Sequence, residues 1–144
     1  MKKFKFRLSK VLRVRQVRER IRETELGRAR ASLAREREAE SILLRKIDEN
    51  SHELGRKLAQ RFSAVDAMMY ERHIEALKAD AAVQAERVCD AQTEVEKSKA
   101  HLLRARQQRK ALDRLHEKHR QQYIQNLFAY EQKVLDDIKK HERR

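Results

Sequence analysis

The stretch IEALKADAAVQAERVCDAQTEVEKSKAHLLRA, residues 74–105, decides the fold. It lies in a run of roughly 75 residues, from about Asp66 to His141, that contains neither Pro nor Gly. Apolar or small residues recur in it at alternating steps of three and four, which places them on one stripe of a helix. The stripe consists of Ile74, Leu77, Ala81, Gln84, Val88, Ala91, Val95, Ser98, Leu102 and Ala105. A helix ~110 Å long with one narrow apolar stripe needs a partner helix.

The preceding segment is the expected partner. Its expected apolar stripe, which Glu40 and Ser51 interrupt, runs through Leu8, Val11, Leu12, Val14, Val17, Ile21, Leu26, Leu33, Leu44, Ile47, Leu54 and Leu58. A break follows, where Ser63 and Asp66 have the spacing of a capping box. The alternative turn is Asn50-Ser51. We therefore predict an all-α fold, with two long helices in an antiparallel coiled-coil hairpin.

The expected bounds are about 8–60 for the first helix, 60–66 for the turn and 66–141 for the second helix, with residues 1–144 as a single domain. The chain is 41% charged, 5% aromatic and has a mean hydropathy of −0.96, values typical of a coiled coil or long helix. Disorder is the competing interpretation of such a polar chain. The sustained stripe favours the helices.

The net charge of +13 is concentrated at the two ends. Residues 1–35 carry +10 and residues 101–144 carry +6, whereas residues 36–100 carry −3. A hairpin brings the basic ends together. The expected partners of this end are therefore acidic: a protein channel, a membrane surface or a nucleic acid.

A turn near Ser63 brings Leu8 level with about Lys118, so that the last two dozen residues form a lone helical arm. The arm keeps an apolar stripe, which Ile124, Phe128 and Leu135 widen. The stripe residues are Tyr123, Leu127, Tyr130, Val134 and Ile138. A lone helix with a wide exposed apolar face is marginal in water. The arm is therefore predicted to dock on a partner or on another copy.

Few residues suggest chemistry. His116 and His119 could contribute to a zinc site, but a solvated basic face is the preferred interpretation. Met68-Met69-Tyr70 is interpreted as a plug at the turn, with an adaptable binding surface as the alternative. No Gly-rich phosphate loop or catalytic triad occurs in the sequence, and we expect no enzyme, cofactor or metal site.

The location expected from the sequence is the cytoplasm. Cys89 is the single cysteine, which fits a reducing compartment. The start of the chain has no uninterrupted apolar run, so we expect no signal peptide, and no stretch of 18 apolar residues predicts a transmembrane helix.

Four motifs resemble the FliJ family, the small stalk proteins of the flagellar type III export apparatus. Residues 4–12, FKFRLSKVL, resemble the start of that family, and residues 69–77, MYERHIEAL, the opening of its second helix. Residues 110–118, KALDRLHEK, and 130–137, YEQKVLDD, resemble its C-terminal signature. Asp137 departs from the Glu expected there. The resemblance covers essentially the whole chain.

This resemblance implies a stalk that enters the hexameric ring of the export ATPase, promotes its assembly and activity, and contacts the export gate's cytoplasmic domain and export chaperones. No small-molecule substrate is expected. The implied location is peripheral, at the inner face of the cell membrane at the flagellar base. The predicted ring-binding residues are Phe4, Phe6, Leu8, Arg13, Arg15, Tyr123, Leu127 and Tyr130. The predicted gate-binding residues are His73, Leu77 and Gln84, on a stripe beside the helix–helix seam.

Three alternatives stay open. The first is the equivalent stalk of a virulence type III secretion system. The second is a basic coiled coil that binds nucleic acid or an anionic membrane, with residues 1–21 as a basic amphipathic helix; the scarcity of aromatic residues disfavours nucleic acid. The third is a parallel homodimer without the hairpin.

Overall fold

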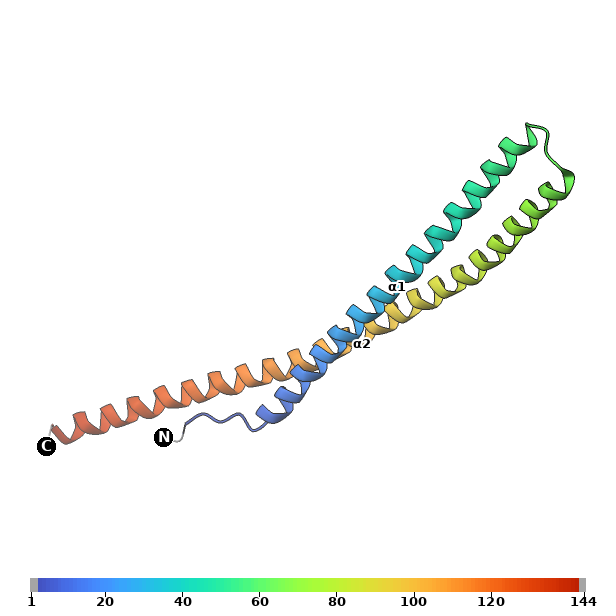
Figure 1. Cartoon of the computed structure of the whole chain (residues 1–144). Helices are drawn as coiled ribbons and strands as arrows, with labels where there is room; N and C mark the ends of the chain where they lie inside the picture. Colours follow the sequence, from blue (N-terminus) through green and yellow to red (C-terminus); the bar gives the residue numbers. More distant parts are fainter. Residues whose placement is uncertain (1–2, 143–144) are drawn as a thin grey trace. The chain divides into compact units, whose positions relative to one another are not determined.

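Two long helices account for nearly all of residues 3–142, which the computed structural model describes. Helix α1 spans Ser9–Leu58 and helix α2 spans Ala64–Glu142 (Figure 1). No strand occurs among the described residues. The prediction of an all-α fold with two long helices packed against each other is confirmed, whereas the single domain stays a prediction.

The chain divides into two units by its contacts. The terminal unit comprises Met1–Arg22 and Leu102–Arg144, and the hairpin unit comprises Glu23–His101. The terminal unit carries 22 Lys and Arg against 7 Asp and Glu, and the hairpin unit 14 against 16. The two basic ends of the chain therefore belong to one unit, as the sequence predicts.

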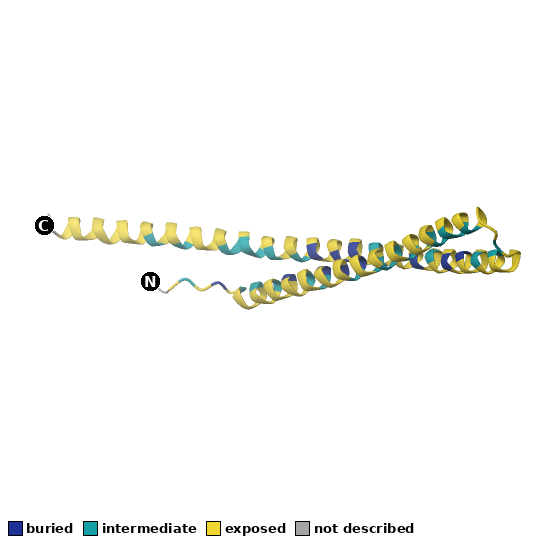
Figure 2. Ribbon diagram, turned by 45° about the horizontal axis from the view of Figure 1, so that its top comes forward, coloured by how far each residue is buried: buried dark blue, intermediate teal, exposed yellow. Residues whose placement is uncertain are grey.

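The hairpin unit confirms the predicted stripe of α2. Its residues belong to the seam, meaning the residues of each helix that face the other; the buried ones are dark blue in Figure 2. The buried seam residues of this unit are Leu26, Ala29, Leu33, Ile74, Leu77, Gln84, Val95 and Ser98. The helices are antiparallel, because Glu36 contacts Gln84. Burial of these side chains stabilises the unit by the hydrophobic effect.

Residues 59–63 separate the two helices, so α2 begins at Ala64, before the predicted start at about residue 66. The Ser63 hydroxyl accepts a hydrogen bond from the backbone N–H of Val65 at 3.3 Å, which caps the start of α2. The alternative turn at Asn50-Ser51 is wrong, because both residues lie inside α1. Their side chains donate to the backbone carbonyls of Lys46 and Ile47, each at 2.7 Å, which satisfies these polar groups within the helix.

The turn is closed by an aromatic pair and not by the methionines. Phe62 and Tyr70 meet edge to face, with ring centroids 6.0 Å apart. The Lys57 ammonium donates to the Tyr70 hydroxyl at 2.7 Å and lies 4.7 Å from the centre of that ring. Of the predicted plug Met68-Met69-Tyr70, Tyr70 therefore closes the turn, whereas Met68 and Met69 are exposed, so the prediction is wrong for the two methionines.

The terminal unit is antiparallel as well. Arg15 contacts Gln108, and Phe6 contacts His119, which agrees with the predicted level of Leu8. Residues 3–8 are not helical; α1 begins at Ser9. The N-terminal alternation of apolar and basic residues is therefore an extended lead-in to the helix.

The residues of α1 that face α2 are not all those predicted from its apolar pattern. Val11, Val14, Val17 and Ile21 are 42–50% exposed, so their assignment to the seam is wrong. Counting back from the buried Leu26 in steps of four and three gives the true seam positions. These are Arg22, Glu19, Arg15 and Leu12, each buried or half-buried. Leu44 and Leu58 are also exposed, and Leu43 takes the seam position beside Leu44.

Candidate partner-binding surfaces

The extended N-terminal segment packs along α2 through two phenylalanines. The Phe4 ring lies 5.6 Å from the rings of both His116 and Tyr123. The Phe6 ring lies 4.9 Å from His116 and 5.8 Å from His119, nearly perpendicular to the first. Phe6 is 8% exposed. Edge-to-face contacts of this kind stabilise the packing beyond the area they bury, so the segment is held on the helix.

This packing changes how several predicted residues can act. Phe4, Phe6 and Leu8 were predicted to anchor the protein in a ring, and all three are buried or half-buried against this chain. His116 and His119 contact phenylalanine rings, and no group of three possible metal ligands occurs in residues 3–142. The histidines are therefore packing partners of the N-terminal segment in this structure.

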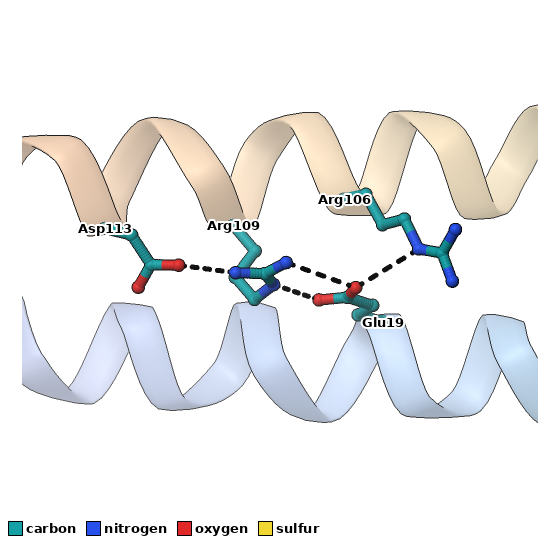
Figure 3. Close-up of polar contacts among 4 residues, drawn as sticks. All are labelled: Glu19, Arg106, Arg109 and Asp113. Atoms are coloured by element: carbon teal, nitrogen blue, oxygen red, sulfur yellow. Dashed lines mark hydrogen bonds and ion pairs between the residues drawn. The ribbon is translucent and has the colours of Figure 1, made fainter.

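A charged cluster crosses the seam next to this segment (Figure 3). The buried Glu19 of α1 accepts hydrogen bonds from the Arg109 guanidinium of α2. Arg106 lies 3.4 Å from the same carboxylate, and Arg109 also donates to Asp113 at 2.5 Å. The hydrogen bonds to Glu19 and to Asp113 raise the pKa of Arg109 above its ordinary value. The cluster therefore compensates a carboxylate inside an otherwise basic unit.

The two predicted steering arginines lie in different environments. Arg13 is exposed. Arg15 is half-buried and donates to the side-chain oxygen of Gln108 at 2.6 Å. Arg13 is therefore the one that can meet a partner without losing a contact within the chain.

The arm, residues 124–142, carries several exposed large apolar residues. Tyr123 and Leu127 are half-buried, and Tyr130 is 54% exposed. Most of the arm is exposed around its circumference (Figure 2). Its exposed large apolar residues are Ile124, Phe128, Tyr130, Val134, Leu135 and Ile138. A contiguous apolar surface of this kind marks an interaction site.

The predicted gate-binding residues do not form a stripe beside the seam. Leu77 and Gln84 are 8% and 6% exposed and lie in the seam itself, so this placement is wrong. Gln84 donates hydrogen bonds to Glu36. The side chain that faces solvent is that of His73, which has exposed Met69 one helical turn before it.

Comparison with protein families gives a match over nearly the whole chain. A family model described as "Flagellar FliJ protein" matches residues 4–142. The chain belongs to the FliJ family. This membership assigns it to flagellar protein export, as a structural component of the export apparatus.

Other comparisons add no relatives to this FliJ-family protein. Neither the curated proteins nor the solved structures searched contain a match. Within the described part of the chain, neither helix is both long and apolar enough to span a membrane.

Sequence reasoning missed one surface of this FliJ-family protein. We name it the outer valine face: Val11, Val14, Val17 and Ile21, exposed on α1. The sequence could have revealed this face, because its residues are not at alternating steps of three and four from Leu26 and Leu33 and so lie on another side of the helix. The charged residues at the true seam positions obscured it, since a charge predicts a solvated position unless its partner is known.

Proposed function

We propose that this FliJ-family protein is a stalk that binds the hexameric flagellar export ATPase and promotes its assembly and activity. The observation that carries the proposal is the exposed apolar surface of the arm, next to a strongly basic unit. Apolar side chains that become buried supply affinity, and charges around them supply orientation and encounter rate. Both properties suit an element that enters a ring.

The residues proposed to act are divided by their exposure. Leu127 and Tyr130 would anchor the arm in the ring, and Arg13 would steer the approach. Phe4 and Phe6 would act indirectly, by holding the N-terminal segment against α2 beside the arm. Tyr123 and Arg15 would do the same, because each already contacts a residue of this chain.

We further propose that the hairpin unit contacts the cytoplasmic domain of the export gate and that the protein engages export chaperones. His73 is the predicted gate residue that a partner can reach in this structure. Leu77 and Gln84 would contribute by fixing the α2 surface on which His73 lies. The location we propose is peripheral, at the inner face of the membrane at the flagellar base.

Two other functions from the sequence are less well supported. The family match favours a flagellar over a virulence system. Binding to nucleic acid or an anionic membrane fits the charge of the terminal unit, but it gives no role to the apolar surface of the arm, whose residues 124–142 hold three Lys against four Asp and Glu. That alternative predicts binding that weakens steeply with salt.

The test is ATP hydrolysis by the cognate export ATPase, measured in moderate salt with and without this protein. Stimulation by the full chain, lost on deletion of Gln121 to Arg144, is expected. The combined Leu127→Ser and Tyr130→Ser variant should lose most of it, and Arg13→Glu should raise the concentration needed for half-maximal stimulation. Matched controls are Leu58→Ser and Arg35→Glu, at exposed positions of the hairpin unit.

Stimulation that survives the deletion would remove the arm from the mechanism. Absence of both stimulation and co-elution, together with tight binding to DNA or anionic vesicles, would favour the basic coiled-coil alternative. Circular dichroism of each variant establishes that its helices are retained.

A further inference from the structure

The terminal unit exposes two apolar faces of matching length. The outer valine face runs from Val11 to Ile21, about 15 Å along α1. The arm face, which we define as Leu127, Tyr130, Val134 and Ile138, runs about 16 Å along α2. We propose that the protein forms a reciprocal dimer, in which the arm face of each copy packs on the outer valine face of the other. The dimer is a state of the free protein, because the arm face includes Leu127 and Tyr130, and its test does not involve the ATPase.

The arm face continues the seam of α2. Leu102, Ala105 and Arg109 mark the side of α2 that packs on α1. At 3.6 residues per turn, the arm face points within about 40° of the same direction. Along the arm, this side of α2 does not face α1, because α1 begins at Ser9, which is level with residues well before Leu127. The geometry therefore favours a helix as the occupant.

The outer valine face can accept such a helix without disturbing the seam. Its mean direction lies about 125° around α1 from the mean direction of the four seam positions of the terminal unit. A second helix docked there would leave the contacts of Glu19 with Arg106 and Arg109 in place. In the dimer, each α1 would lie between its own α2 and the arm of the partner copy.

The charges around the two faces are complementary. Exposed Lys10, Arg13 and Arg18 surround the outer valine face, whereas exposed Glu131 and Asp137 border the arm face. In a symmetric pair whose two copies run in opposite directions, the arm lies parallel to the partner's α1. A register that places Val14 opposite Val134 then brings Arg18 beside Asp137 and Lys10 beside Glu131. Charged pairs that flank an apolar helix contact fix its register and partner.

A second copy would cover both apolar faces, whereas a bilayer would cover only the outer valine face. An anionic membrane would attract the outer valine face through its arginines and lysine, but it would repel Glu131 and Asp137. The reciprocal contact is symmetric and closed, so it ends at a dimer. Because the contact occurs twice, the dimer buries twice the surface of a single contact. A standard interface buries roughly 800 Å² per partner.

The experiment is sedimentation velocity of the full chain at low salt over a range of protein concentrations. A monomer–dimer equilibrium is expected. Arg18→Glu and Asp137→Arg should each raise the dimer dissociation constant at least about tenfold, which corresponds to 1.4 kcal/mol. The chain that carries both changes should recover the dimer, because the two charges exchange places across the interface.

Substitutions on the apolar faces test the same contact. Val14→Ser and Val134→Ser should each weaken the dimer, and Val83→Ser, at a 51% exposed position of the hairpin unit, should not. In a Cys89→Ser background, Val14→Cys combined with Val134→Cys should give a covalent dimer on mild oxidation. Val83→Cys combined with Val134→Cys should leave the chains separate.

Several outcomes would overturn the proposal. The chain could stay monomeric at every concentration, or it could form a dimer that neither charge reversal weakens. A disulfide between the Val14→Cys residues of two copies would indicate instead a dimer whose two copies run in the same direction. A monomeric chain whose binding to anionic vesicles is lost in Val14→Ser would assign the outer valine face to a membrane.

Discussion

The side-chain amide of Gln84 on α2 donates hydrogen bonds both to the backbone carbonyl of Glu36 on α1, at 2.9 Å, and to its carboxylate, at 2.6 Å. This polar pair lies inside the apolar seam of the hairpin unit, where Gln84 is buried. A polar layer in a coiled coil fixes the register of the helices at a cost in stability. The pair therefore explains how a hairpin unit with few large apolar residues holds one alignment.

Replacing both partners with leucine should stabilise the protein. We expect the Glu36→Leu, Gln84→Leu double variant to be more stable by about 1 kcal/mol or more, because apolar packing replaces desolvated polar groups. Thermal unfolding followed by circular dichroism measures the change. Gln84→Leu alone should gain less, since it leaves the Glu36 carboxylate half-buried without its donor. A lower midpoint for the double variant would show that the polar pair stabilises the fold.

Two neighbouring leucines provide a matched test of the seam in the terminal unit. Leu102 is 6% exposed and Leu103 is 58% exposed. Leu102→Ala should destabilise the protein by about 2 to 3 kcal/mol, because it removes buried methylenes and leaves a cavity. Leu103→Ala should change stability by less than about 0.5 kcal/mol. Equal effects of the two substitutions in urea unfolding would contradict the assigned seam.

The Glu19 cluster should be sensitive to removal of its one acidic group from α1. Glu19→Gln takes away the carboxylate that Arg106 and Arg109 share, so the thermal midpoint should fall by several degrees. Glu94→Gln, at an exposed position, is the control. A loss of the same size in both variants would mean that the cluster contributes nothing specific.

The raised pKa of Arg109 predicts how the difference in thermal midpoint between the native chain and Glu19→Gln depends on pH. Because its pKa is raised, the stabilisation that it supplies is complete below the ordinary pKa of arginine and is lost only as pH rises through the higher value. The difference in midpoint between the native chain and Glu19→Gln should therefore stay constant from neutral pH to about pH 10. Unfolding curves across this range measure it, and a steep fall within the range would contradict the assignment.

The contact of the N-terminal segment with α2 depends on Phe6. Phe6→Ala removes its contacts with His116 and His119, so residues 3–8 should detach while the helices remain. Tryptic cleavage after Lys5 and Arg7 should accelerate at least about tenfold, since local opening governs such cleavage. Phe128→Ala, at a 61% exposed position of the arm, should leave the cleavage rate unchanged. Unchanged cleavage in Phe6→Ala would show that the ring does not hold the segment.

The hairpin turn and the stripe of α2 could be predicted from sequence because their signals are local. Ser63 follows the end of the apolar pattern of the first helix, and a serine hydroxyl caps a helix whatever lies around it. The α2 stripe contains small or apolar residues at nearly every inward position, so its face is unambiguous. The first helix has two faces that could have been buried. The face that stays exposed carries the valines and is the more hydrophobic of the two.

The sequence by itself determined the two long helices, the break between them and the concentration of positive charge at the two ends of the chain, because these follow from periodicity, capping residues and composition. Only the tertiary structure decided which face of α1 is buried. Glu19 can lie in the seam because Arg106 and Arg109, about 90 residues away in the chain, compensate its charge. That compensation exists only when the helices are paired, and it leaves the outer valine face on the surface.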